Sequence, residues 1–265
     1  MARSNGWTRE QLLVALFLYC RTPFGKIHGG NPEIILWASR IGRTANALAM
    51  KMSNLASLDP AITSTGRSGL KSASRADRAI WDEANADWGH FTVELAKALE
   101  QFDCTEIALE SERKDEHSSG QINEESADYS STDRTASVLL RVGQNLFRNA
   151  VLSAYDNRCC ISGLSHPKFL IASHIVPWRD DPQNRLNPRN GLCLSVLHDR
   201  AFDQGLLAIA DDMSVLVSPM LKHSPDAFLK ETVLAYEGKT IELPEKFEPD
   251  KAFLNHHHQH IFLSN

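Results

Sequence analysis

Two histidines and an asparagine in the second half of the sequence have residue types and a spacing suited to hydrolytic chemistry. His174 follows an apolar run, Asn190 lies 16 residues later, and His198 lies 8 residues after that. Histidine titrates near neutral pH and can accept a proton from water, as hydrolysis of a phosphodiester requires. Taken singly, each residue also fits a plainer role: a hydrogen-bonded core histidine, an asparagine in a turn and a histidine on a helix surface.

Three short elements would position these side chains. Residues 169–172 are predicted to form a strand that leads into His174, a polar loop carries Asn190, and a short helix carries His198. A helix that begins near Ser137 precedes them. Further short strands are expected at residues 206–209, 215–217 and 240–243. The second half of the chain therefore predicts a mixed α+β domain.

The motifs around these residues resemble those of the HNH endonucleases, the ββα-metal nucleases, and more narrowly their bacterial restriction-like members. The pattern His-Ile-x-Pro-Trp begins at His174, Asn-Gly-Leu-Cys-Leu begins at Asn190, and His-Asp-x-Ala-Phe-Asp begins at His198. The resemblance covers roughly residues 138–210, and its three-part signal is more specific than a lone pair of histidines.

This resemblance implies a role for each of the three residues. His174 would be the general base that activates water, Asn190 would hold the loop and the imidazole of His174 in place, and His198 would ligate one divalent metal ion. The ion would stabilise the phosphorane and the leaving 3′ oxygen, and the products would carry 5′-phosphate ends. Mg²⁺ or Mn²⁺ is the expected ion, with Ni²⁺ or Zn²⁺ as alternatives.

The sequence departs from the family pattern in two places. Ser173 stands where many members carry Asp or His as a further metal ligand. Asp199 and Asp203 are nearby carboxylates that could take over this role, because hard divalent cations favour oxygen ligands, or they could be solvated residues of a helix. Some members also bind a structural zinc through two Cys-x-x-Cys pairs. Gly163 and Val196 stand where the second cysteines would fall, so no structural zinc is expected.

The N-terminal part of the chain is predicted to be a helical module. N-cap patterns at Thr8, Asn31 and Thr44 start three of its helices. The second and third are joined by a glycine turn, which matches the helix-turn-helix pattern, whose second helix reads the DNA major groove. A plain three-helix bundle is the alternative. The DNA-binding candidates of this module are Arg43, Asn46 and Lys51.

Charge and composition divide the chain further. The net charge is +4 over residues 1–90, −8 over 91–135 and −1 over 136–265, so acidity gathers in the middle. Residues 111–135 contain almost no large apolar side chains and are predicted to be an acidic flexible linker. The predicted domains are a helical DNA-recognition module at residues 1–110, this linker, and an HNH nuclease domain at residues 136–265.

The sequence therefore predicts an α+β protein that acts as a metal-dependent endonuclease on double-stranded DNA, as a bacterial restriction or defence enzyme. Its N-terminal module would select the DNA, and a homodimer would cut both strands. A catalytically inactive HNH-fold regulator that binds DNA is the alternative. Further candidates for DNA contacts, or for solvated loops, are Arg148, Arg179 and Arg189.

Two remaining features concern location and the C-terminus. The chain has no apolar run of the roughly 18 residues that a membrane span needs, and no signal-peptide pattern, so a cytoplasmic protein without a membrane partner is expected. The histidine-rich run at residues 256–260 suggests a metal site, but a surface helix or coil is the simpler interpretation.

Overall fold

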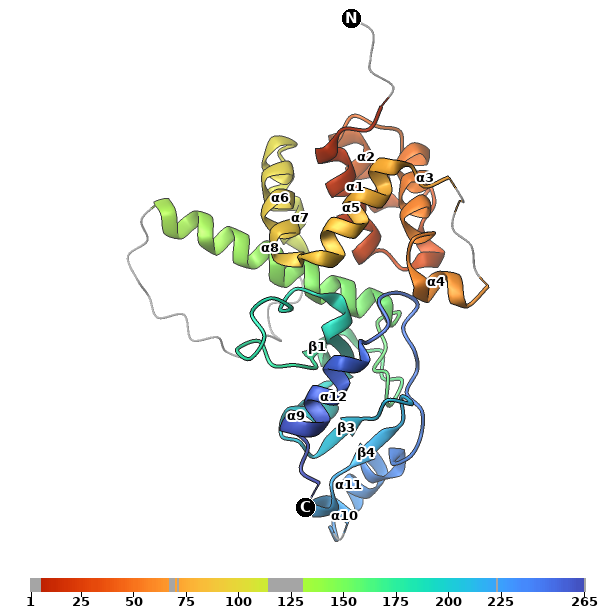
Figure 1. Cartoon of the computed structure of the whole chain (residues 1–265), viewed down its shortest axis with the longest axis vertical. Coiled ribbons are helices and arrows are strands. Elements are labelled where there is room, and N and C mark those ends of the chain that lie inside the picture. The colour runs from red at the N-terminus through yellow and green to blue at the C-terminus, as the bar shows by residue number, and fades with distance from the viewer. Residues whose placement is uncertain (1–5, 67–69, 71, 114–130, 223, 265) are drawn as a thin grey trace, which may run out of the picture. The chain divides into compact units, whose positions relative to one another are not determined.

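The structure, a computed structural model, describes residues 6–66, 70, 72–113, 131–222 and 224–264. The chain forms two compact units, Met1–Leu146 and Phe147–Asn265, and the division falls inside one long helix. The first unit is helical, and the second combines helices with two-stranded sheets (Figure 1), which confirms the predicted α+β class. Within the described residues, no helix is both long and apolar enough to cross a membrane.

The N-terminal unit is built around its first helix. Every residue from Leu12 to Cys20 is buried, and helices from three other parts of the unit pack against this segment. A helix that is apolar on all sides is stable only when it is enclosed in this way. The elements of the unit are α1 (Arg9–Arg21), η1 (Phe24–Lys26), α2 (Pro32–Arg40), α3 (Ala45–Ala56), α4 (Pro60–Ser64), α5 (Arg75–Ala86), α6 (Trp88–Gln101), α7 (Thr105–Arg113) and the first part of α8 (Ser131–Ala154).

Local hydrogen bonds fix the predicted helix starts. The Thr8 side chain and the Gln11 side chain form a capping box at α1, and the Asn31 and Thr44 side chains cap α2 and α3. Gly42 has a φ of +70° in the turn between α2 and α3, a backbone conformation that favours glycine. The helix-turn-helix pattern thus corresponds to two real helices joined by a glycine turn.

The predicted linker, residues 111–135, lies for the most part outside the described residues. Its first three residues are the end of α7, and its last five residues are the start of α8. Both neighbouring helices therefore extend further toward the acidic segment than the composition suggested. The apolar spacing that begins near Ser137 marks only the later turns of α8.

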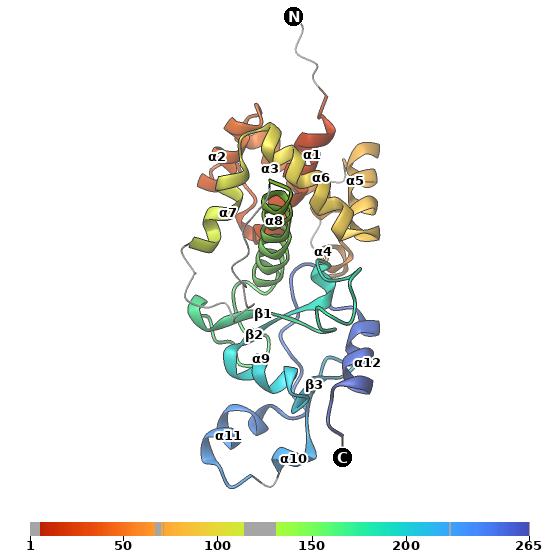
Figure 2. The same cartoon turned by 90° about the vertical axis from the view of Figure 1, so that its left-hand side faces the viewer.

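The C-terminal unit contains two antiparallel strand pairs. β1 (Leu170–His174) pairs with β2 (Gly191–Ser195) in a register that places His174 opposite Gly191. Figure 2 shows this pair with the short helix α9 (Val196–Asp203), which packs against both strands. The remaining elements are η2 (Pro167–Phe169), η3 (Pro188–Asn190), β3 (Leu207–Ile209), β4 (Val215–Val217), α10 (Pro219–Lys222), α11 (Ala227–Thr232), η4 (Leu234–Tyr236) and α12 (Lys251–His260).

The prediction of a strand at residues 240–243 is wrong. The segment makes only an isolated bridge between Ser214 and Thr240. Ile241 is buried as the alternating pattern suggests, but β3 and β4 pair only with each other. The sequence pattern at residues 240–243 correctly indicated a buried side chain. It could not show whether a neighbouring strand is available for pairing, because the tertiary structure decides that.

The start of β2 requires a residue without a side chain. A Cβ atom at Gly191 would lie 2.4 Å from Val151 Cγ2, 3.0 Å from Phe147 Cζ and 3.2 Å from the Pro188 carbonyl oxygen. The glycine therefore lets β2 approach the last turns of α8 closely. This approach brings the Phe147 ring next to the end of β1.

The C-terminal helix α12 is fixed to α9 by a buried histidine. The His257 ring stacks on Phe202 with 3.7 Å between ring centroids, and its Nε2 lies 3.1 Å from the Phe202 carbonyl oxygen. Burial, only partly offset by that carbonyl, lowers the pKa of His257 to about 4. Because a carbonyl can only accept, Nε2 carries the proton and the buried Nδ1 is a bare acceptor.

Acid is therefore expected to destabilise the protein through His257. Its pKa in the folded state, about 4, is below the roughly 6.5 of an unfolded histidine. As pH falls from about 6.5 toward 4, the unfolded protein takes up a proton at this histidine before the folded protein does. The free energy of unfolding should therefore fall by about 3 kcal/mol in all. Chemical denaturation measured between pH 7.5 and about pH 4 should show this loss.

The matched variants are His257→Gln and His258→Gln. The glutamine amide can still donate to Phe202 O but does not titrate, so the acid-dependent loss should shrink in His257→Gln. His258 is exposed, and its replacement should leave the pH profile unchanged. An identical acid profile for His257→Gln and the original protein would contradict the assignment.

Candidate active site

His174, at the end of β1, is held in one orientation and one tautomer. Its ring stacks on Phe147 with 4.0 Å between centroids and a 6° interplanar angle, and the edge of Trp178 meets it at 5.5 Å. Its Nε2 lies 2.9 Å from the carbonyl oxygen of Arg185. Since the carbonyl can only accept, Nε2 carries the proton and Nδ1 presents a lone pair.

The surroundings of His174 keep its imidazole neutral. Burial lowers its pKa from the ordinary value, and the hydrogen bond to the Arg185 carbonyl offsets part of this effect. A histidine whose pKa is lowered is uncharged at neutral pH. Among the described residues, nothing is hydrogen-bonded to its Nδ1. The side chain can therefore accept a proton at that atom.

Asn190 ties the loop after His174 to the start of β2. Its side chain is completely buried. Oδ1 accepts a 2.8 Å hydrogen bond from the Val176 amide, while Nδ2 donates to the carbonyl oxygens of Val176 at 3.2 Å and Asn184 at 3.3 Å. All the hydrogen-bonding capacity of the amide is thus spent on the backbone. The residue is a positioning residue for the loop that carries the Arg185 contact to His174.

Replacing Asn190 with alanine is expected to destabilise the C-terminal unit by more than about 2 kcal/mol. A buried polar group that loses its partner costs about 1–3 kcal/mol, and this substitution leaves the Val176 amide and two carbonyl groups without theirs. Urea denaturation measures the change. Asn190→Asp keeps the acceptor for the Val176 amide and loses the donor.

The control for this substitution is Asn187→Ala. Asn187 is only half-buried, and its side chain caps the short helix η3, so its loss should cost about 1 kcal/mol or less. Equal destabilisation by the two substitutions would show that the Asn190 clamp is not the source of the effect.

Helix α9 carries two neighbouring carboxylates, of which Asp199 lies near Ser173 of β1. Asp199 and Asp203 are four residues apart in one helix, so they lie on the same face. Asp203 is exposed on its outer side, yet partial burial against the protein, and then repulsion by Asp199, raises its pKa to about 6. Burial also raises the pKa of Asp199, although the nearby Ser173 hydroxyl and Arg200 lower it in part. Carboxylates that resist ionisation together are stabilised by a cation between them.

Ser173 contributes a third oxygen to this cluster. Its Oγ is buried, and no described residue lies at hydrogen-bond distance with suitable geometry, although the hydroxyl is close enough to lower the pKa of Asp199. A buried hydroxyl without a partner is uncommon in folded proteins. Ser173 directly precedes His174 in the chain, but successive side chains of a strand point to opposite faces.

These donors fit a hard divalent cation. Carboxylate and hydroxyl oxygens suit Mg²⁺ and Mn²⁺ better than Zn²⁺, which prefers nitrogen and sulfur. Within the described residues, no group of three or more His, Cys, Asp or Glu side chains could hold a metal ion. Mg²⁺ is commonly held by one or two carboxylates and completes its shell with water and substrate phosphate oxygens, so two carboxylates are sufficient.

His198, the expected metal ligand, makes contacts inside the protein with both of its ring nitrogens. The ring is buried, and its Nε2 lies 2.8 Å from the Thr232 carbonyl oxygen. Its Nδ1 lies 3.0 Å from Ser195 Oγ and 3.4 Å from Cys159 Sγ. Both ring nitrogens are therefore used inside the protein. These contacts hold the start of α9 in place, and the metal-ligand role of His198 stays a prediction.

Most of the residues described so far lie within a segment that is similar to a known family. Residues 159–210 match the HNH endonuclease family. The C-terminal unit therefore contains a segment that is similar to the HNH endonucleases. This confirms the resemblance seen in the motifs, and the matched segment contains β1, β2 and α9 with the candidate residues Ser173, His174, Asn190, His198, Asp199 and Asp203. HNH nucleases act on DNA and generally use a divalent metal ion. No curated protein matches the chain.

Sequence reasoning missed the groups that hold the HNH histidine in place. The Phe147 ring comes from α8, and the Arg185 carbonyl oxygen comes from the loop between the strands. The Arg185 guanidinium donates to the Trp178 carbonyl oxygen at 2.7 Å and lies 5.3 Å from the Trp178 ring centroid. The aromatic Phe147 was visible in the sequence only as one apolar helix position, and a backbone carbonyl has no sequence signal.

Two of the three DNA-binding candidates in the N-terminal unit have internal roles. Arg43 donates to Gln11 Oε1 and to the Gly6 carbonyl oxygen, and its guanidinium covers the Trp7 ring. Lys51 is 7% exposed and forms a 2.7 Å ion pair with Asp77. Arg43 holds the segment before α1 against the start of α3. Lys51 holds helix α5 against α3. Neither is free to contact DNA in this structure.

Asn46 is placed differently from the two cations. It is exposed on the first turn of α3 and lies against Gly29, where a Cβ atom would have no room. Of the three candidates, Asn46 is the most exposed, since Arg43 is half-buried and Lys51 is buried.

The basic candidates near the HNH domain also differ in availability. The Arg148 guanidinium lies 3.4 Å from the Leu170 carbonyl oxygen, which is at the start of β1. Arg189 lies 3.7 Å from Asp250, with both side chains 42% exposed. The Arg179 side chain is 87% exposed and contacts only its neighbour Asp180 at 3.3 Å. Arg179 is therefore the most accessible cation of the three.

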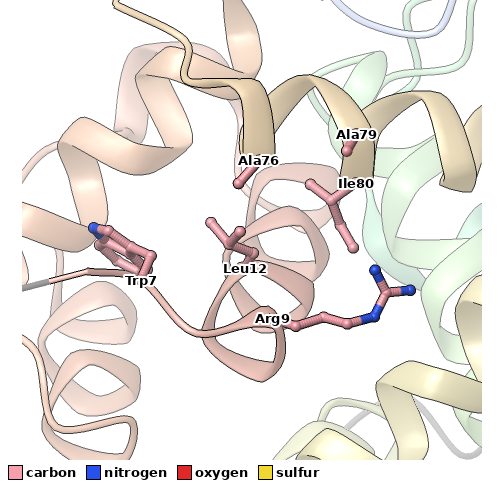
Figure 3. A pocket seen from close by; sticks show the side chains of 6 residues that line it. All are labelled: Trp7, Arg9, Leu12, Ala76, Ala79 and Ile80. Atoms are coloured by element: carbon pink, nitrogen blue, oxygen red, sulfur yellow. The ribbon is translucent and has the colours of Figure 1, made fainter. Parts of the chain in front are cut away.

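A small pocket in the N-terminal unit does not provide a second site. Figure 3 shows it between the segment before α1, the start of α1 and helix α5. Its volume of about 170 Å³ is below the roughly 300–1,000 Å³ typical of small-molecule sites. The pocket is lined by Trp7, Arg9, Leu12, Ala76, Ala79 and Ile80.

Proposed function

We propose that this protein is a divalent-metal-dependent DNA endonuclease that hydrolyses phosphodiester bonds with His174 as general base. The observation that carries the proposal is the neutral His174, with its Nδ1 lone pair free, in a segment that is similar to the HNH endonucleases. A water molecule that attacks a phosphate must lose a proton, and Nδ1 is the atom that takes it. Asn190 and the Arg185 carbonyl keep that atom in place.

Asp199 and Asp203, with the Ser173 hydroxyl, would hold one Mg²⁺ or Mn²⁺ ion. When bound, this ion supplies positive charge for the phosphorane and for the leaving oxygen. The raised pKa values of the two carboxylates support this assignment, because a bound cation favours the charged form of both and offsets the repulsion that Asp199 exerts on Asp203. The backbone position of Asp199 and Asp203 depends in turn on the buried His198.

We further propose that the N-terminal unit selects the DNA and that the enzyme acts in the cytoplasm in restriction or defence. The support is the glycine turn between α2 and α3, with the exposed Asn46 at the start of α3. Asparagine is a residue type that pairs bidentately with adenine. One HNH site cuts one strand, so cutting duplex DNA at a defined position would use a homodimer.

The test is a cleavage assay on supercoiled plasmid and on phage DNA that carries modified bases. We expect the purified full chain to nick or cut DNA with Mg²⁺ or Mn²⁺ and to be inactive with EDTA. Discrete fragments would support DNA selection, whereas random nicking would contradict it. Folded protein that binds DNA but cuts none of it with either ion would overturn the nuclease proposal in favour of an inactive HNH-fold regulator.

A further inference from the structure

The C-terminal half of α12 presents two histidines on one face. His256 and His260 are four residues apart, and their ring centroids are 4.5 Å apart with 47° between the ring planes. Residues with this spacing lie above one another on a helix. His260 is exposed and His256 is half-buried, so the pair is accessible to solvent.

The helix that carries this pair is held rigidly. Leu254 and His257 are its buried residues, and the His257 ring stacks on Phe202 of α9. Asp250 caps the N-terminus of the helix through the Ala252 amide. His258 lies on another side, where its ring contacts Phe262 at 5.4 Å. The paired imidazoles are therefore presented by a fixed backbone, and His258 is not part of the pair.

We propose that His256 and His260 form a second metal site, which takes an imidazole-preferring divalent ion of the Zn²⁺, Ni²⁺ or Cu²⁺ class. Imidazole is a borderline ligand that suits these ions, whereas Mg²⁺ and Mn²⁺ prefer carboxylate oxygens. His260 lies in the last turn of α12, where the helix dipole favours positive charge. The ion completes its coordination with water, since the described residues offer no third side-chain ligand of the usual types there.

This site differs in chemistry from the carboxylate pair of α9. Asp199 and Asp203 offer oxygen to a hard cation, while His256 and His260 offer only nitrogen. The two sites should therefore select different ions. Metal binding by the histidine pair can be tested whether or not the protein is a nuclease. Variants of one pair serve as controls for the other.

The test is calorimetric titration of the untagged full chain with Ni²⁺ as the titrant. The buffer contains a large excess of Mg²⁺, which occupies sites that prefer oxygen ligands. We expect one binding event that persists in the Asp199→Asn/Asp203→Asn variant. It should weaken at least about tenfold in His260→Ala and in His256→Ala, because losing even an outer-shell partner weakens metal affinity by about 10–100-fold. His258→Ala, the matched control, should bind as the original protein does.

A second readout is the melting temperature. Ni²⁺ should raise it in the original protein and in His258→Ala but not in His260→Ala, because only the folded helix brings the pair together. His260 is exposed, so its replacement is compatible with folding. The proposal is overturned if no event appears, if His258→Ala weakens binding as much as His260→Ala, or if the event disappears only in the aspartate variant.

Discussion

Replacing His174 with alanine is expected to lower the rate of DNA cleavage by about 10²–10⁴-fold, the usual contribution of a positioned general base. The ring is the only group at the end of β1 with a free lone pair on a nitrogen held in a fixed tautomer, among the residues that the structure describes. The measurement is the single-turnover rate on plasmid DNA with saturating Mg²⁺ or Mn²⁺. DNA affinity should change little, because the alanine removes a proton acceptor and not a phosphate contact.

The matched control is His166→Ala. His166 precedes β1 and is exposed, with its ring against Phe169, so its loss should leave the rate within about twofold of the original, in line with the small effects of surface substitutions. Loss of the Phe147 stack could disturb β1 in His174→Ala, and a melting curve separates this effect from catalysis. A folded His174→Ala protein with an unchanged rate would rule out the general-base role.

Replacing Asp203 with asparagine should abolish metal-dependent cleavage without weakening the metal-free fold. Its pKa of about 6 in the folded protein is above the ordinary value of about 3.9, so the folded state holds this proton more tightly than the unfolded state. Protonated Asp203 therefore favours folding: this contribution to the free energy of unfolding is complete below about pH 4 and is lost as pH rises through about 6. At pH 7.5 the folded protein holds a charged carboxylate in an unfavourable position. A neutral asparagine removes that cost, so the melting temperature at pH 7.5 should rise or stay the same.

Although the metal-free fold should keep its stability, these substitutions should weaken metal binding and activation by metal. We expect Asp203→Asn and Asp199→Asn each to weaken Mn²⁺ activation at least about 100-fold, the upper end of what loss of an outer-shell partner costs. The stabilisation that Mn²⁺ gives the original protein should also disappear. In the original protein, Mn²⁺ affinity should fall as pH drops through about 6, where Asp203 takes up a proton.

Glu231→Gln is the control for these carboxylate variants. Glu231 is an exposed acid of α11, and its neutralisation changes the net charge by the same amount. Cleavage and Mn²⁺ stabilisation should both persist in this variant. If Asp203→Asn lowered the melting temperature and kept Mn²⁺ activation, the carboxylate pair would not be the metal site.

The sequence by itself determined the features that depend on neighbouring residues. Helix starts at Thr8, Asn31 and Thr44 appear where predicted because an N-cap hydrogen bond joins residues only two or three positions apart. The HNH segment was recognised for a similar reason, since His174 and Asn190 lie in short motifs with fixed spacing. The α+β class followed from these local patterns.

Only the tertiary structure decided which side chains are free to act. In α9 each residue is turned about 100° from the previous one, so His198 points toward Thr232 and Ser195 while Asp199 lies near Ser173. Spacing in the sequence does not fix that helical phase, because packing of α9 against β1 and β2 sets it.

The same holds for the basic residues of the N-terminal unit. Arg43 and Lys51 have the residue types of DNA contacts, but Trp7 lies beneath both cations, and Lys51 also pairs with Asp77. Their partners come from distant parts of the chain, and a buried charge must be paired to be tolerated. Long-range contacts of this kind determined which of the candidate residues remain available for function.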